Sequence, residues 1–282
     1  MDVPTNLNPA QPILPALASH DPELAARLVS RRSALKGGAA IAAGLATTPV
    51  LLASLARDAF GQAGALPAVV IGVLNFALVL EEFEVTFYSA GLAAPNLIPG
   101  PDRPIFERIL ANETAHRNAL RATLGPAARP RPTFDLTGGS GSGNGFYANG
   151  LTDYEVYKAM AQAFEDNGVR AYKGQAPALL PYDDVLTTAL TIHSVEARHA
   201  AEVRRLRGNF EDIAPFTAWI PGSTANVPGP AAGVYQGEGN TIQGGVDVTT
   251  VTTVSAERVS EAFDEPLTQA QVFALVRPFL VL

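Results

Sequence analysis

The sequence predicts an all-α fold: a four-helix bundle with a long crossover between its second and third helices and an irregular C-terminal extension. Three observations support this prediction. Hydrophobic residues make up 47% of the 282 residues, which is enough for a sizeable core. The motif E-x-x-H occurs twice. Four long segments, bounded by Pro, Gly or capping residues, show the apolar pattern of helices: 68–92, 103–124, 152–174 and 184–207.

Residues 1–63 are predicted to be a leader that is not part of the bundle. Residues 1–29 are rich in Pro, Ala and Leu and show no continuous hydrophobic period. The segment Ser30-Arg31-Arg32-Ser33-Ala34-Leu35-Lys36 follows, and after it comes an apolar run rich in Gly and Ala, residues 37–53. The pattern resembles a twin-arginine export signal, with Ala34 where that signal usually has Phe.

This resemblance implies that the export machinery acts on residues 30–63 and that the mature protein is periplasmic or extracellular. Small residues end the segment, so we expect cleavage near Ala63. The alternative is an uncleaved membrane anchor formed by residues 37–53, a length at the lower limit for spanning a bilayer.

The first two helices are expected to form a hairpin within a bundle domain that covers residues 64–208. The first lies between Pro67 and Pro95 and is almost wholly apolar up to Leu80, which favours a buried helix over a strand. The second can be capped by Asp102 and stops at Gly125-Pro126. The Pro- and Gly-rich residues 126–150 then supply the long crossover.

The third helix is expected to begin with a capping box formed by Thr152 and Glu155 and to end near Gly174. The fourth is expected to begin at Asp183 and to stop at Gly208. Together they form the second hairpin of the predicted bundle.

Residues 209–282 change in character to Pro, Gly, Thr and Val. Short strands are predicted around residues 246–254, and a short helix is predicted from Thr268 to about Arg277. This extension has too little periodic apolar sequence for a core of its own, so we expect it to pack on the bundle, with the lone Trp219 as an anchor.

The chain contains two copies of the pattern E-x6-Y followed by E-x-x-H. The upstream Glu precedes the Glu of E-x-x-H by 32 residues in the first copy and by 31 in the second. In each E-x-x-H, the carboxylate and the imidazole project from one helix face. The residues are Glu81, Tyr88, Glu113 and His116 in the first copy, and Glu165, Tyr172, Glu196 and His199 in the second.

Two such hairpins brought together would place four carboxylates and two imidazoles at one level, the ligand set described for ferritin-like di-iron and di-manganese proteins. The chain has no Cys, so any metal must be bound by oxygen and imidazole nitrogen. These donors suit Fe(II) or Mn(II). The predicted cofactor is therefore two Fe or two Mn ions.

Several neighbouring residues compete with the predicted ligands or are expected to support them. Glu82 and Glu84 compete with Glu81, which we prefer because apolar residues flank it along one helix stripe.

Tyr88 and Tyr172 are expected to hydrogen-bond to ligand carboxylates. His193 lies on the same side of its helix as His199 and is expected either to support a ligand or to be a core residue whose hydrogen bonds are satisfied, with direct ligation as the alternative. On the third helix we prefer Glu165 to Asp166, whose neighbours are polar.

Together these features resemble the bacterial ferritin-like domain family that includes desiccation-related proteins. The resemblance rests on LNFALVLE, which ends at Glu81, on both E-x-x-H motifs and on AFDEPLT, which ends at Thr268. It covers roughly residues 66–280 and implies a ferritin-like fold with a dinuclear centre. The long Gly-rich crossover and the extension depart from storage ferritins and argue against an iron-storing cage.

The formal net charge of −7 argues against nucleic acid as a partner. The first hypothesis for function is a di-metal oxidoreductase, catalase-like or an oxidase, that reacts with O2 or H2O2 in oxidative or desiccation stress. The alternatives are a non-enzymatic envelope stress protein whose metal site is structural or vestigial, and a ferroxidase without storage. The sequence leaves homo-oligomerisation open.

Overall fold

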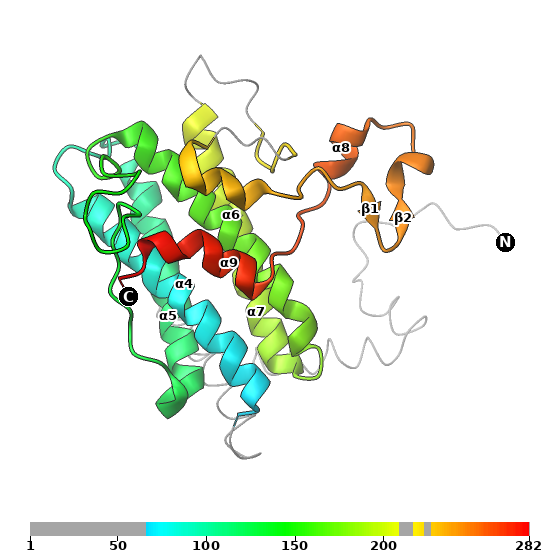
Figure 1. Ribbon diagram of the computed structural model, residues 1–282, viewed down its shortest axis with the longest axis horizontal. Helices are drawn as coiled ribbons and strands as arrows, with labels where there is room; N and C mark the ends of the chain where they lie inside the picture. Colours follow the sequence, from blue (N-terminus) through cyan, green and yellow to red (C-terminus); the bar gives the residue numbers. More distant parts are fainter. Residues whose placement is uncertain (1–65, 209–216, 223–226, 282) are drawn as a thin grey trace, which may run out of the picture. The chain divides into compact units, whose positions relative to one another are not determined.

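The computed structural model describes residues 66–208, 217–222 and 227–281, so the predicted leader and its twin-arginine signal lie outside the described residues. All the elements described below belong to one compact unit, Pro49–Leu282. Four long helices dominate it, and the predicted all-α fold is confirmed (Figure 1). They are α4 (Ala68–Ala93), α5 (Arg103–Leu124), α6 (Tyr154–Leu179) and α7 (Asp183–Gly208).

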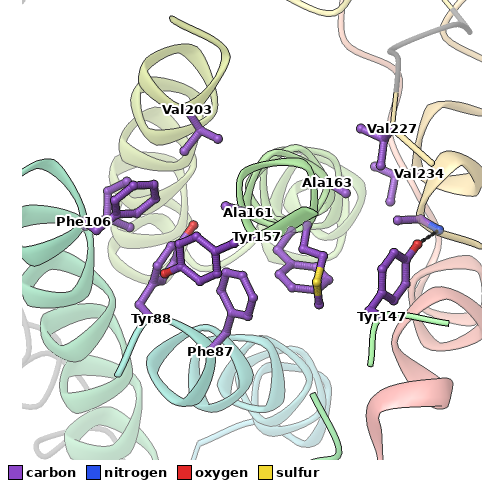
Figure 2. Close-up of a cluster of buried hydrophobic side chains, with 14 of the residues drawn as sticks. Phe87, Tyr88, Phe106, Tyr147, Tyr157, Ala161, Ala163, Val203, Val227 and Val234 are labelled. Atoms are coloured by element: carbon purple, nitrogen blue, oxygen red, sulfur yellow. Dashed lines mark hydrogen bonds between the residues drawn. The ribbon is translucent and has the colours of Figure 1, made fainter. Parts of the chain in front are cut away.

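The four helices pack as two hairpins. Helix α4 packs against α5 and α6 packs against α7, and the hairpins meet along α4 and α6. Ring contacts show that α4 and α6 run in opposite directions. Phe83 contacts Phe164 at a centroid distance of 4.7 Å, and Phe87 stacks on Tyr157 at 4.6 Å. Figure 2 shows Phe87, Tyr88 and Tyr157 gathered in this core.

The start of α6 differs from the predicted capping box. Asp153 is the N-cap residue, and its carboxylate accepts the backbone N–H groups of Glu155 at 2.9 Å and Val156 at 3.3 Å. Thr152 belongs instead to the preceding turn, where its N–H and hydroxyl both donate to the Asn149 carbonyl. The capping box was wrong because the adjacent Asp supplies a better acceptor for the first free N–H groups.

Helix α6 also continues past Gly174, where the sequence predicted its end. A Cβ atom at Gly174 would lie 1.9 Å from the Leu267 carbonyl oxygen, so the glycine makes room for the C-terminal segment. The Leu267 N–H donates to the Arg170 carbonyl nearby, at 3.1 Å. Pro177 lies in the last turn of the helix, where it removes one N–H donor just before the helix ends. At α5 the predicted Asp102 occupies the N-cap position but makes no side-chain cap, and its carboxylate accepts the Tyr154 hydroxyl at 2.8 Å.

The crossover between α5 and α6 begins with a short 3-10 helix, η2 (Gly125–Ala127), and is organised around Asp135. The Asp135 carboxylate accepts the N–H groups of Thr137, Gly141 and Gly143 at 2.9 to 3.0 Å. The Thr137 hydroxyl also donates to it, at 2.6 Å. The hydroxyl bond and the backbone bonds lower the pKa of Asp135 to about 2, against the effect of its burial. The Gly-rich run therefore wraps a carboxylate of the chain itself.

The C-terminal extension contains short elements only. They are η3 (Gly229–Tyr235), β1 (Ile242–Gln243), β2 (Val246–Asp247), η4 (Val248–Thr250), α8 (Ala256–Ser260), α9 (Gln269–Val276) and η5 (Arg277–Phe279). Strands β1 and β2 pair antiparallel, with Ile242 opposite Asp247. The predicted strands at 246–254 are thus reduced to two residues, and 3-10 helix η4 follows them. The predicted short helix is confirmed as α9, which Thr268 begins with a capping box.

The extension packs on the bundle through α9 and η3, both of which contact α6. Val234, Tyr235 and Val272 are buried there. Trp219 is not the anchor, because 47% of its surface is exposed, whereas the adjacent Ile220 is only 4% exposed. The prediction was wrong because an Ile next to the aromatic ring fills the core position instead.

Within the described ranges, no helix is both long enough and apolar enough to cross a membrane. The alternative anchor at residues 37–53 lies outside those ranges.

Candidate metal centre

The fold brings all six predicted ligands together inside the bundle, each with at most 8% of its surface exposed. They form two overlapping groups of four, and within each group one ligand atom per residue lies within 4.8 Å of the others. Glu113 and Glu196 belong to both groups. The first group is Glu81, Glu113, His116 and Glu196, and the second is Glu113, Glu165, Glu196 and His199.

The two groups follow the repeat in the sequence. Helices α4 and α6 each supply one Glu, and α5 and α7 each supply one E-x-x-H pair. His116 Nδ1 lies 3.0 Å from a Glu113 oxygen and 3.2 Å from a Glu196 oxygen. His199 Nδ1 lies 2.7 Å from Glu113 and 3.2 Å from Glu165. Each imidazole therefore directs the same nitrogen at carboxylates from both hairpins.

The two tyrosines of the repeat join the hairpins. The Tyr88 hydroxyl donates to Glu165, and the Tyr172 hydroxyl donates to Glu81. Each Tyr thus binds the upstream Glu of the other copy. All four side chains are buried, so these bonds fix one oxygen of each carboxylate and leave the other free to face the centre.

Burial and mutual charge set the protonation of the cluster. Burial raises the pKa of Glu81 to about 7 and raises that of Glu196 well above its usual value. Burial would lower the pKa values of His116 and His199, but the facing carboxylates raise both well above the usual range. Burial also opposes ionisation of Glu113, yet its bonds to both imidazoles lower its pKa. The imidazoles thus carry positive charge that two divalent cations would replace.

The donor set fits two such cations. Several buried carboxylate oxygens accept no well-directed hydrogen bond and face only the imidazole nitrogens of the cluster: Glu81 Oε2, Glu113 Oε1 and both oxygens of Glu196. A buried carboxylate oxygen left without a partner is costly, and a metal ion would satisfy it. Four carboxylates also match the charge of two divalent ions. Three of these four oxygens belong to Glu113 and Glu196, the two residues that both groups share.

The acidic neighbours of the ligands have other partners or lie outside both groups. Glu82 pairs with Arg121 through a hydrogen bond of 2.6 Å and with Arg131 at 3.3 Å, so it serves a different face of α4. Asp166 is held by Arg204 and by the Tyr235 hydroxyl. Glu81 rather than Glu82 on α4, and Glu165 rather than Asp166 on α6, therefore belongs to a ligand group.

Glu84 differs from both of these neighbours because it is buried and faces the cluster without joining either group. Burial raises its pKa well above the usual value, and the charges of Glu196, Glu113 and Glu165 raise it further. Its neutral form is therefore favoured.

His193 is not brought to the cluster. Its Nδ1 lies 2.9 Å from the Val169 carbonyl oxygen, and burial lowers its pKa. Among the described residues it belongs to neither ligand group.

Two residues at the centre were not singled out in the sequence. The Asn112 amide lies 3.0 Å from His199 Nε2, the ring nitrogen that faces away from the carboxylates. A Cβ atom at Gly168 would lie 2.7 Å from a Glu196 oxygen, so this glycine makes room for the shared carboxylate. In the second copy of the repeat Gly168 holds the position that Glu84 holds in the first, three residues after the upstream Glu.

The four-helix bundle, the two E-x-x-H motifs and the six converging side chains fit a known protein family. Residues 70–209 match the family described as ferritin-like domain. The matched range covers all four bundle helices except the first two residues of α4, and it includes every predicted ligand. No curated protein matches the chain.

We expect replacement of Glu81 and Glu84 by Gln to separate their roles. Glu81→Gln removes one carboxylate charge from the first group at nearly constant volume, so bound metal should fall from about two ions per chain to about one if both groups bind metal. Glu84→Gln should leave about two ions, because a neutral amide resembles the neutral acid. Elemental analysis of protein purified after metal-replete expression would show the difference. The reverse pattern would mean that Glu84 is the ligand.

Proposed function

We propose that this chain is an exported ferritin-like protein whose two ligand groups hold a pair of Fe or Mn ions that react with O2 or H2O2 in oxidative or desiccation stress. The observation that carries the proposal is the sharing of Glu113 and Glu196 by both groups. Carboxylates that belong to two ligand sets hold two ions close enough to act together.

Two metal ions that each change by one oxidation state exchange two electrons together, which matches the reduction of O2 to H2O2 or of H2O2 to water. The chain contributes position and environment. Tyr88 and Tyr172 hold the two terminal carboxylates in place across the bundle. Asn112 orients the His199 ring. Buried rings such as Phe106 exclude bulk water on one side, which strengthens every charge interaction inside.

Added metal should raise thermal stability if the ligand groups bind it. An ion present at about 1,000 times its dissociation constant stabilises a protein by about 4 kcal/mol when the unfolded chain does not bind it. In a domain of this size that raises the melting temperature by about 8 to 16 °C. Calorimetry of metal-free protein with and without Fe(II) or Mn(II), followed by assays of O2 and H2O2 consumption, tests the proposal.

A melting temperature indifferent to both ions would contradict the proposed metal centre and favour the non-enzymatic envelope stress protein. Metal binding without turnover of either oxidant would mean that the metal site is structural. Oxidation of added Fe(II) without H2O2 disproportionation would favour the ferroxidase without storage.

Export is the part of the proposal that rests on the sequence alone, on the twin-arginine pattern that contains Arg31 and Arg32 and the apolar run that follows it. A folded protein loaded with metal before export would avoid competition from copper and zinc outside the cell, which bind such donors more tightly. Changing both arginines to Lys is expected to hold the precursor in the cytoplasm, as cell fractionation would show. Export of that variant at the rate of the unaltered chain would remove the support for this step.

A further inference from the structure

A small apolar cavity lies among the four long helices at one end of the bundle. Its volume is about 20 Å³ of space for the centres of water-sized molecules. All four helices line it, with Ala77 on α4, Ala119 on α5, Tyr172 on α6 and Ile192 on α7 among the lining residues. Apolar side chains dominate its walls. Many of them, including Leu120 and Val185, belong to one cluster of buried hydrophobic residues.

The cavity lies one helical turn from the ligand cluster on three helices. Ala77 precedes Glu81 by four residues, Ala119 follows His116 by three, and Ile192 precedes Glu196 by four. One turn of helix rises about 5.4 Å. On α6 the Tyr172 ring lines the cavity while its hydroxyl donates to Glu81. A single aromatic ring therefore connects the cavity to a ligand carboxylate.

The other side of the cluster is packed with aromatic rings. Tyr88 contacts Phe87 at a centroid distance of 5.2 Å, and Phe106 contacts Tyr157 at 5.2 Å (Figure 2). The sequence repeat would make the two sides alike, but the side chains make them different. The Tyr172 side has open space and the Tyr88 side is filled by rings.

Four polar groups on the cavity wall already have hydrogen-bond partners. The hydroxyl groups of Thr123 and Thr188 donate to carbonyl oxygens of their own helices, each at 2.9 Å. The Gln175 side-chain oxygen accepts from Gln269 at 2.9 Å. The Tyr172 hydroxyl hydrogen is directed at Glu81. A polar guest such as H2O2 would lose its hydrogen bonds to water on entering, whereas an apolar guest would lose none.

Size then selects among apolar guests. About 10 to 15 Å³ of such space is needed for one water-sized molecule, so this cavity has room for a guest as small as a diatomic molecule. Thr123 and Thr188 are half-buried, more exposed than the other lining residues, and mark the side that faces solvent. We propose that this cavity is a binding and entry site for O2, which makes O2 the oxidant that the centre receives by this route. The inference rests on the proposed function.

The cavity itself can be tested by xenon, a probe of O2-like apolar sites that needs no metal. Crystals pressurised with xenon should show an anomalous peak between Ala119 and Tyr172. Ala119→Leu should remove the peak, because three added carbons fill the space. The matched control is Ala122→Leu, which adds the same atoms on the exposed face of the same helix and should leave the peak unchanged.

Oxidation kinetics test whether O2 uses the cavity. Protein loaded with Fe(II) without oxygen is mixed with O2 or with H2O2, and the loss of Fe(II) is followed. Ala119→Leu should slow oxidation by O2 about ten-fold or more and change oxidation by H2O2 less than about two-fold, since the dry cavity serves the apolar oxidant. Ala122→Leu should change neither rate.

A second variant keeps the test decisive if Ala119→Leu does not fold. Val185→Ala enlarges the cavity on α7 and should increase xenon occupancy without slowing O2. Equal slowing of both oxidants by Ala119→Leu, unchanged O2 kinetics after loss of the xenon peak, or no xenon in the unaltered protein would each overturn the inference. In all these outcomes the bound iron is measured separately. A protein that binds no Fe or Mn would instead overturn the proposed function.

Discussion

Replacing His116 and His199 together by Ala is expected to reduce bound metal from about two ions per chain to an unmeasurable level, and with it any turnover of O2 or H2O2. Each imidazole supplies the only nitrogen donor of its ligand group in the described residues. Without them the four carboxylates would have to bind both ions and also bear their own repulsion in a buried site. Elemental analysis and oxidant consumption measure the result.

The matched control for this variant is His193→Ala. That residue lies on α7 with His199 but contacts the Val169 carbonyl, so its loss should leave the metal content unchanged. Calorimetry should show that both variants fold. If the double variant retains two ions, the ligand groups lie elsewhere. If His193→Ala also loses them, the helix rather than the ligands is responsible.

Replacing Arg170 by Met is expected to destabilise the fold by about 3 to 5 kcal/mol, since it leaves a buried carboxylate without its partner. Arg170 Nε lies 2.7 Å from a Glu238 oxygen, and both residues are only 1% exposed. The guanidinium also donates to the carbonyl groups of Val234, Gln236 and Glu265. This one side chain of α6 therefore holds three points of the C-terminal extension.

The effect of Arg170→Met should depend on pH in a definite direction. Burial raises the pKa of Glu238 to about 7, although Arg170 opposes the rise. An acid with a raised pKa in the folded state costs stability once the pH exceeds its unfolded value of 4.5, and the cost grows until the folded pKa is passed. Removing Arg170 raises the folded pKa further. The stability difference between the two proteins should therefore widen above pH 7.

Chemical denaturation at pH 6 and at pH 9 measures this difference. Arg205→Met is the matched control, because Arg205 pairs with Glu202 on the surface of α7 and such a pair contributes at most about 1 kcal/mol. A difference between Arg170→Met and the unaltered protein that is constant with pH would contradict the role given to Glu238. A loss of stability no larger than that of Arg205→Met would contradict the role given to Arg170 in holding the C-terminal extension.

The amino-acid sequence by itself determined the helices and the six candidate ligands. Long apolar segments with capping residues predict helices from local interactions alone, and the E-x-x-H spacing places two donors on one face whatever surrounds the helix. The repeat of Glu81 and Glu165 at nearly equal distances from the two motifs then distinguished the inward carboxylates from Glu82 and Asp166. Spacing held this information because residues three and four positions apart lie on one face of a helix.

Only the tertiary structure decided what depends on contacts between distant residues. The predicted end of α6 was wrong because Gly174 does not stop the helix. A glycine is needed there because the Leu267 carbonyl passes too close for a Cβ atom. The cross-pairing of Tyr88 with Glu165 and of Tyr172 with Glu81 depends on how the hairpins meet. The cavity beside Tyr172 exists because four helices leave a volume that no side chain fills, and no local pattern in the chain encodes such a volume.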